Sequence, residues 1–426
     1  MKNTNRRYVI GSGLLAASLL FAGCSAQYPS VEAGQTSGQK AEQAVSFAAT
    51  KNTTRIQGED AEDLSISTAQ MIWPATKAGT KPNVVLLAPK ESWQAQLVAL
   101  DLVHHPSDGP LLVTEKGKVS QEVMDELMRL HPQGASDGTQ VIAIGMDASV
   151  AEELSGHFKV KEIRGEKPEE LAAAIDQYYA EASGSLPASV VVSTSEAPEY
   201  AVPAGNWISH MPEPLLYVTK GSVPQATADS LKKRNGKATI YLLGPESVID
   251  RSVEKELQSY GKVVRIAGND PVANAIAFAA YKDPQTGFGW GITTAGHGLV
   301  LADAKNVKEA IPVASFAHRG KHAPLLLTER EQAPKPLVDY LTTLKPLYKE
   351  EPTEGPYNHL YIVGDQTRVS AEQQGDLDHL IEIEAQNGQG HGGHSSGGDQ
   401  GSQGAHPADH GTPAPLDNGS TDHSGH

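Results

Sequence analysis

One short pattern decides the fold because it occurs three times: Gly109-Pro110-Leu111-Leu112-Val113-Thr114, Glu213-Pro214-Leu215-Leu216-Tyr217-Val218-Thr219 and Ala323-Pro324-Leu325-Leu326-Leu327-Thr328. Each copy is a short apolar run that ends in threonine, which is typical of a strand buried on both faces. The proline fits the start of a strand, where a missing N–H group is tolerated. The sequence therefore predicts the same buried strand three times.

Two further patterns accompany this strand in the same order each time. One comprises Arg55-Ile56-Gln57-Gly58, Glu162-Ile163-Arg164-Gly165 and Arg265-Ile266-Ala267-Gly268. The other comprises Val141-Ile142-Ala143-Ile144-Gly145, Ile240-Tyr241-Leu242-Leu243-Gly244 and Leu360-Tyr361-Ile362-Val363-Gly364. Amphipathic stretches of helical length separate them, and in the first copy these are 62–76, 93–103, 121–130 and 148–154. Strands that alternate with helices predict parallel sheets covered on both faces.

We therefore predict an α/β fold of three tandem Rossmann- or flavodoxin-like parallel-sheet repeats in a pseudo-threefold arrangement. The predicted repeats cover 50–157, 158–260 and 261–384, and each is long enough to be a domain. The glycine-rich stretch Gly287-Phe288-Gly289-Trp290-Gly291 could suggest a dinucleotide-binding loop, but such a loop needs a strand before it and a helix after it, and the sequence predicts neither here. We therefore predict that residues 282–297 are an insertion loop.

The chain begins with the features of an export signal. Lys2, Arg6 and Arg7 precede an apolar run that ends at Cys24, the single cysteine. The run is shorter than the roughly 20 residues that span a membrane. Small residues directly before a cysteine resemble the lipobox of bacterial lipoproteins. We expect 1–23 to be a lipoprotein signal peptide, Cys24 to carry the lipid, and 24–49 to be a flexible tether.

Composition excludes several classes of protein. The 426 residues include 35 Lys and Arg against 51 Asp and Glu, a net charge of -16. Loss of the three positive charges in the signal would make the mature chain -19. Such a charge argues against nucleic-acid binding, because phosphate neutralisation needs a basic face. One cysteine excludes an internal disulfide framework and a cysteine-based zinc site.

The three patterns together resemble the cell wall-binding repeat type 2 family, with three tandem copies per chain. The resemblance covers about 335 of the 426 residues. It implies α/β copies that pack as a trefoil and attach an exported protein non-covalently to anionic polymers of Gram-positive cell walls. It also implies a monomer whose three copies form an intramolecular pseudo-trimer.

Four basic residues are candidates for polymer binding: Arg55, Arg265, Arg319 and Lys321. Guanidinium groups make paired charge-assisted hydrogen bonds to phosphate and carboxylate. For Arg55 and Arg265 the alternative is that each anchors a strand end by binding backbone carbonyls, since Glu162 occupies the aligned position. For Arg319 and Lys321 the alternative is an ordinary solvated surface.

Residues 385–426 contain almost no apolar side chains and are predicted to be a disordered tail. The tail holds six of the sixteen histidines in three close pairs. Neutral imidazole suits Zn, Ni and Cu(II), so the tail is a candidate site for a divalent metal, although its histidines could also be incidental. The candidate ligands are His391, His394, His406, His410, His423 and His426.

We expect a non-catalytic lipoprotein on the outer face of the cell membrane that binds cell-wall polymer or peptidoglycan and requires no cofactor. The first alternative is a solute-binding lipoprotein that delivers a metal such as zinc to a transporter. The second is an envelope hydrolase on an α/β scaffold, which rests on analogy of fold alone.

Overall fold

The computed structural model describes residues 48–319 and 321–387. These residues form an α/β fold with three four-stranded sheets, and the strands within each of these sheets pair in parallel. The prediction of an α/β chain with parallel sheets is confirmed. The signal peptide, Cys24, most of the tether and the histidine-rich tail lie outside the described residues.

The three sheets share one strand order. In space the first sheet is β3 (Leu111–Thr114), β2 (Val85–Pro89), β4 (Val141–Ile144) and β5 (Val160–Ile163); the second is β7 (Leu215–Val218), β6 (Ser189–Thr194), β8 (Ala238–Leu243) and β9 (Gly261–Ile266); the third is β11 (Leu325–Thr328), β10 (Gly298–Asp303), β13 (His359–Val363) and β1 (Thr53–Ile56). A separate pair joins β12 (Leu347–Tyr348) to β14 (Glu384–Ala385).

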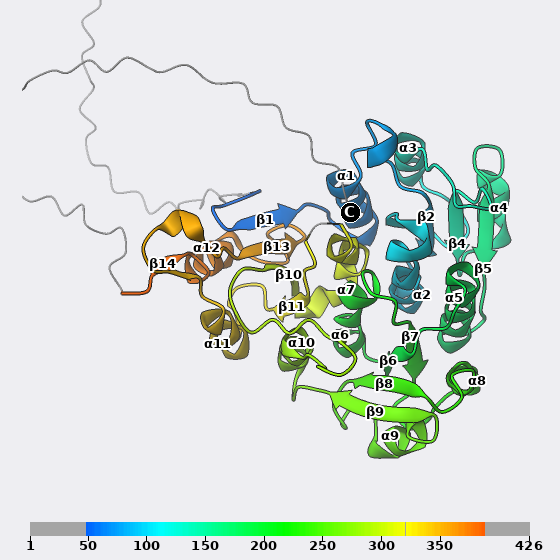
Figure 1. The fold of residues 1–426 in the computed structure, drawn as a ribbon. Helices are drawn as coiled ribbons and strands as arrows, with labels where there is room; N and C mark the ends of the chain where they lie inside the picture. Colours follow the sequence, from blue (N-terminus) through cyan, green and yellow to red (C-terminus); the bar gives the residue numbers. More distant parts are fainter. Residues whose placement is uncertain (1–47, 320, 388–426) are drawn as a thin grey trace, which may run out of the picture. The chain divides into compact units, whose positions relative to one another are not determined.

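The third sheet takes its outer strand from the other end of the chain. Thr53 pairs with Leu360 and Ile56 with Val363, so β1 lies beside β13, as the blue and orange strands of Figure 1 show. The Arg-Ile strand that opens each predicted repeat is therefore the outer strand of a neighbouring sheet. Sheet divisions fall one strand later than the predicted boundaries at 157/158 and 260/261, because a tandem sequence pattern can be divided at any point of its period.

Helices separate successive strands along the chain (Figure 1). They are α1 (Ala61–Ile72), α2 (Trp93–Ala99), α3 (Gln121–Leu130), α4 (Ala148–Leu154), α5 (Pro168–Ser183), α6 (Pro198–Ala201), α7 (Ala204–Ile208), α8 (Gln225–Lys232), α9 (Arg251–Leu257), α10 (Pro271–Ala280), α11 (Lys335–Thr343) and α12 (Ala371–Leu380). Short 3₁₀ or π segments are η1 (Ala78–Thr80), η2 (Leu100–Leu102), η3 (Val103–Ser107), η4 (Ala304–Ala310), η5 (Pro312–Ala317) and η6 (Pro352–Glu354).

Side-chain caps fix where several helices begin. The Ser120 hydroxyl accepts a hydrogen bond from the Val123 N–H at 3.2 Å, and α3 starts at the next residue, Gln121. The Asp270 carboxylate does the same for Ala273 at 2.8 Å before α10. Such a cap satisfies one of the N–H groups that a helix start leaves unpaired.

The glycine of the Arg-Ile pattern has a packing role. A Cβ atom on Gly58 would lie 2.8 Å from the Leu64 nitrogen, and one on Gly165 would lie 2.4 Å from the Leu171 nitrogen. On Gly268 it would lie 2.2 Å from the Asn274 nitrogen. In each copy the chain passes too close to the first turn of the next helix for any side chain. This contact explains why glycine recurs two residues after isoleucine.

The three parts of the chain meet at one place. A Cβ atom on Gly205 in α7 would lie 2.9 Å from a Leu100 methyl group and 3.7 Å from the Ala314 methyl group. Leu100 belongs to η2 and Ala314 to η5, so segments from three parts of the chain touch here. One apolar cluster accordingly includes residues of all three sheets, from Ile56 to Ile381.

The predicted insertion loop at 282–297 contains neither helix nor strand and packs onto the second sheet. The Phe288 ring stacks on Tyr241 of β8 with ring centroids 3.6 Å apart. The Tyr241 hydroxyl donates to Asp283 at 2.8 Å. The loop therefore completes the core over β8, which gives its aromatic residues a structural role.

Within the described ranges, every helix is too short or too polar to pass through a lipid bilayer.

Candidate functional site

A pocket of about 420 Å³ lies at the amino ends of the third sheet's strands. Its residues come from the first part of β10 and β13 and from the segments just before β1, β10, β11 and β13, so one sheet edge positions all of them. They are Lys51, Asn52, Gly296, His297, Gly298, Lys321, Tyr357, Asn358, His359 and Tyr361. We call this the amino-end pocket.

A buried asparagine holds the wall of the amino-end pocket in place. The Asn358 side-chain oxygen accepts hydrogen bonds from the backbone N–H groups of Gly296 at 2.8 Å and His297 at 3.2 Å. Its amide nitrogen donates to the Leu344 carbonyl at 2.6 Å. Asn358 is 3% exposed, so this contact fixes three chain segments to one another.

Aromatic and basic groups face each other in this pocket. The Lys321 ammonium lies 5.2 Å from the centre of the Tyr361 ring, within the range of a cation–π contact. Tyr357 exposes 53% of its surface. Burial and the nearby Lys321 charge lower the pKa of His359, and burial lowers that of His297, so both imidazoles are neutral at neutral pH.

The charge of the pocket is opposite to that of the chain. Lys51 forms an ion pair with Glu382 at 2.6 Å and lies 3.7 Å from Asp378. In the part of the chain that the structure describes, Lys321 makes no such pair with a carboxylate. An exposed ammonium beside tyrosine, imidazole and amide groups can bind an anionic group and a sugar ring together.

A second pocket lies at the carboxyl ends of the first sheet's strands and has a volume of about 670 Å³. In α/β sheets this edge is the usual place for a ligand. The charged side chains that line it are mixed in sign and include more carboxylates than cations: Lys116, Asp147, Arg164, Glu166 and Glu170. Lys116 lies 3.8 Å from Asp147. This edge therefore attracts anions less than the amino-end pocket does.

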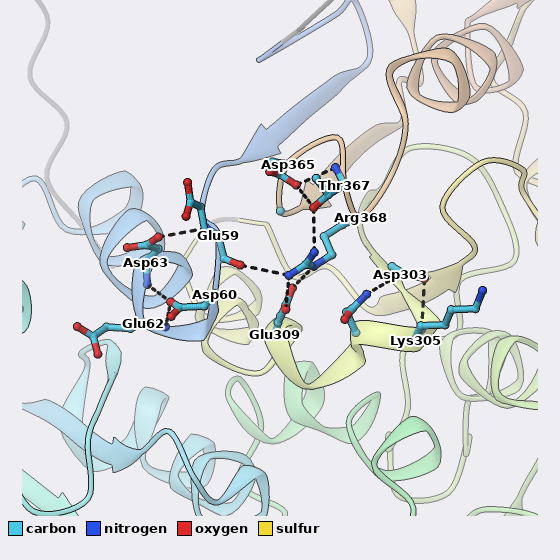
Figure 2. Close-up of polar contacts among 12 residues, drawn as sticks. Glu59, Asp60, Glu62, Asp63, Asp303, Lys305, Glu309, Asp365, Thr367 and Arg368 are labelled. Carbon is cyan, nitrogen blue, oxygen red and sulfur yellow. Dashed lines mark hydrogen bonds and ion pairs between the residues drawn. The ribbon is translucent and has the colours of Figure 1, made fainter. Parts of the chain in front are cut away.

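At the carboxyl edge of the third sheet an arginine links the ends of two strands to η4 (Figure 2). Arg368 donates to both oxygens of Glu309 at 2.6 and 2.7 Å and to the Glu59 carbonyl at 3.2 Å. The neighbouring carboxylates Asp60 and Asp303 accept bonds from backbone N–H groups at the starts of α1 and η4. The acidic groups at this edge thus serve to start helices and to neutralise Arg368.

The two arginines of the Arg-Ile pattern bind backbone carbonyls. Arg55 is 4% exposed and makes five hydrogen bonds, to Gln374 and to the carbonyls of Gly364, Asp365, Val369 and Ser370. Arg265 binds the carbonyls of Gly244 at 2.7 Å and Ile249 at 3.1 Å, with Glu254 at 2.9 Å. Both observations match the alternative in which these residues anchor strand ends.

Loop length explains why the first sheet has a glutamate at this position. Seven residues, 364–370, separate β13 from α12, and seven, 244–250, separate β8 from α9. Only three, 145–147, separate β4 from α4. The arginine clamps a long loop at both of its ends, whereas the short loop has no span to clamp. Glu162 instead pairs with Arg164 at the surface.

The other predicted cations differ in their surroundings. Arg319 forms an ion pair with Asp108 and lies over the Trp73 ring, with the guanidinium carbon 5.8 Å from its centre. Lys321 is exposed and lines the amino-end pocket. The structure thus brings Lys321 together with a pocket and engages Arg55, Arg265 and Arg319 with protein groups. Cys24 and the six tail histidines lie outside the described residues.

Sequence analysis missed one group of side chains. His104, His210 and His318 come from three parts of the chain, and each offers a ligand atom within 4.8 Å of the others. They precede the prolines Pro110, Pro214 and Pro324 by six, four and six residues. A search for histidine at a similar distance before each Pro-Leu-Leu strand would have found them.

The chain matches no family model and no curated protein. The solved structures that share its fold include two from Clostridium difficile. Cwp8 from Clostridium difficile is 15% identical with a TM-score of 0.59, over 78% of this chain and 52% of that chain. Cwp6 from Clostridium difficile is 16% identical with a TM-score of 0.57, over 76% of this chain and 49% of that chain. The chain therefore spans about half the length of these neighbours.

Proposed function

We propose that the chain is an exported, lipid-anchored protein of the cell envelope that binds cell-wall polymer non-covalently. Two observations support this function: the solved neighbours Cwp6 and Cwp8 are cell wall proteins, and the sequence patterns resemble a wall-binding repeat family. Cys24 would hold the protein on the outer face of the membrane. The protein would act by binding, without catalysis.

The amino-end pocket carries this proposal. Lys321 supplies an exposed positive charge over Tyr361 in a chain whose net charge is -16. Tyr357 adds an exposed ring that can lie against the apolar face of a sugar. A wall polymer with phosphate or carboxylate groups would therefore bind at this edge, with divalent cations bridging it to acidic surfaces nearby.

The arrangement of the sheets fits a repeat protein that closes on itself. Each sheet has the order second, first, third, fourth strand, which is the flavodoxin-like order, and β1 supplies the fourth strand of the third sheet. We infer three copies of one unit around a pseudo-threefold axis near Gly205. The chain would then act as a monomer, with the acidic, histidine-rich tail gathering divalent metal.

Co-sedimentation with isolated cell-wall sacculi tests the function. Full-length protein should pellet with sacculi that keep their anionic polymers. Lys321→Glu should weaken this binding about tenfold, the size expected when a charged contact is lost, and Tyr357→Ala should weaken it less. Lys255→Glu is the matched control, because Lys255 is an exposed lysine of α9 outside the amino-end pocket.

Two outcomes would contradict the proposal. Absence of binding, with or without divalent cations, would exclude wall binding altogether. Equal loss in Lys321→Glu and Lys255→Glu would show that net charge, and not the amino-end pocket, determines binding. Repeating the experiment with sacculi stripped of anionic polymer identifies the ligand, because binding that is retained would indicate peptidoglycan and binding that is lost would indicate the anionic polymer.

A further inference from the structure

Three histidines from distant parts of the chain, His104, His210 and His318, lie close together in space. His104 lies in η3, two residues after the end of η2, His210 comes two residues after α7, and His318 directly follows η5. These are the segments that meet at Gly205. The segments around η2, α7 and η5 therefore each contribute one imidazole to the same cluster.

The distances suit shared coordination of one ion. The Nδ1 atoms of His104 and His318 lie 2.7 Å apart, and the His104 ring centre lies 5.8 Å from that of His210. Zinc binds imidazole nitrogen at about 2.0–2.1 Å, which places two tetrahedral ligands roughly 3.3 Å apart. The ligand atoms of the three rings already lie within 4.8 Å of one another, and a bound ion would draw them to that spacing.

One nitrogen of this group has no hydrogen-bond partner among the described residues. His210 Nδ1 is buried and makes no hydrogen bond within the described residues. The opposite nitrogen, Nε2, lies 3.1 Å from His322 Nδ1. A buried polar atom without a partner is costly, and a metal ion would give His210 Nδ1 a partner.

A carboxylate orients one of the other rings. His318 Nε2 lies 2.8 Å from Asp108, and Arg319 donates to the same carboxylate at 2.8 Å. This contact fixes the tautomer of His318 and leaves its Nδ1 directed at His104. A carboxylate behind an imidazole is the usual support of a metal-binding histidine.

The surroundings lower the pKa of two of the three imidazoles. Burial, together with the neighbouring His322, His104 and His318, lowers the pKa of His210 to about 4. Partial burial of the imidazole and the nearby His318 lower the pKa of His104 as well. Both shifts reflect the burial and the close approach of these rings.

We propose that His104, His210 and His318 together form a binding site for one divalent transition metal of the zinc class, with Asp108 as a positioning residue. Three imidazoles suit Zn²⁺, Ni²⁺ and Cu²⁺ better than Mg²⁺ or Ca²⁺, which prefer oxygen ligands. A fourth position would be open to water or to a ligand from outside. This site is separate from the histidine-rich tail and goes beyond wall binding.

The competing explanation is that the histidines only hold the three segments together by hydrogen bonds between rings. It accounts for the His104–His318 contact but leaves His210 Nδ1 without a partner. The two explanations differ in one measurable respect, because only the metal site makes stability depend on added zinc.

The test uses the full-length chain with the six tail histidines replaced by alanine, so that the tail cannot bind the probe. Calorimetric titration with ZnCl₂ should show one Zn²⁺ per chain, and the thermal midpoint should rise with zinc concentration. In this background His104→Ala should weaken zinc binding about tenfold or more, and Asp108→Asn about tenfold. His104 is exposed, so its replacement should leave the fold intact.

His157→Ala is the matched control, because His157 is an exposed histidine after α4 and outside the cluster. It should bind zinc as the background does. The proposal is overturned if the tail-replaced chain binds no zinc, or if His104→Ala binds zinc as tightly as His157→Ala. If His104→Ala changes the thermal midpoint of the zinc-free protein but leaves its zinc affinity unchanged, the role of His104 is purely structural.

Discussion

The first and third sheets have the same strand order but hold their fourth strands differently. β5 follows β4 after one short helix, and its Glu162, opposite Ala143, lies at the surface. β1 comes from the other end of the described chain, and its Arg55, opposite Ile362, is buried under five hydrogen bonds. The locally delivered β5 thus has no clamp, whereas the strand delivered from afar has a fully engaged and buried one; the locally delivered β9 has the more exposed clamp of Arg265.

Further bonds hold β1 at its amino end. The Asp378 carboxylate accepts from the Asn52 N–H at 2.6 Å and from the Thr50 hydroxyl at 2.5 Å. The Asn52 side chain donates to the Asp378 carbonyl at 3.1 Å. Asp378 lies in α12, so the first and last parts of the third sheet are fastened together at both ends of β1.

Arg55→Ala should have the largest effect on stability. It removes a buried side chain and leaves four loop carbonyls without their donor, so the free energy of unfolding should fall by about 3 kcal/mol. Reversible urea denaturation measures this. The free energy of unfolding of Arg55→Lys should lie between those of Arg55→Ala and the unchanged protein, because one ammonium cannot reach both ends of the 364–370 loop. A loss below about 1 kcal/mol for Arg55→Ala would show that β1 does not depend on the clamp.

Arg265→Ala should cost less, about 1–2 kcal/mol. Arg265 clamps a loop of the same length, but it is more exposed and binds two carbonyls and one carboxylate. The same urea measurement gives the value. An effect as large as that of Arg55→Ala would mean that loop length, and not the remote origin of the strand, sets the strength of the clamp.

Glu162→Ala should have the smallest effect, within about 0.5 kcal/mol, as expected for an exposed ion pair. Its loop has three residues and needs no anchor. A loss above about 1 kcal/mol would remove the contrast between the first sheet and the other two.

Much of the fold could be predicted because local signals agree with it. The helices predicted at 121–130 and 148–154 have those bounds in the structure, since strand and helix periods differ clearly there. The partner of β1 was not predictable in this way. The residues of a four-residue strand that is mostly buried do not specify which neighbouring strand it pairs with.

The candidate site was harder to predict. Lys321 could be named from sequence, but Asn358 and Tyr361, which build the pocket around it, are more than 30 residues away along the chain. The role of Arg55 depends on its burial, which the sequence does not state. The three central histidines are over 100 residues apart from one another, so no local spacing indicates a metal site, and only their similar positions before the three Pro-Leu-Leu strands connect them.

The pairing of β1 with β13 also sets an order of assembly. β1 is synthesised before any other strand described here, yet its partner follows more than 300 residues later. Closure of so long a loop is slow compared with local contacts. The first and second sheets can form as their own residues emerge, while β1 waits with an unpaired edge. The strand that is made first therefore pairs only after the first two sheets can form, and a chain cut short before β13 would keep that edge open to other partners.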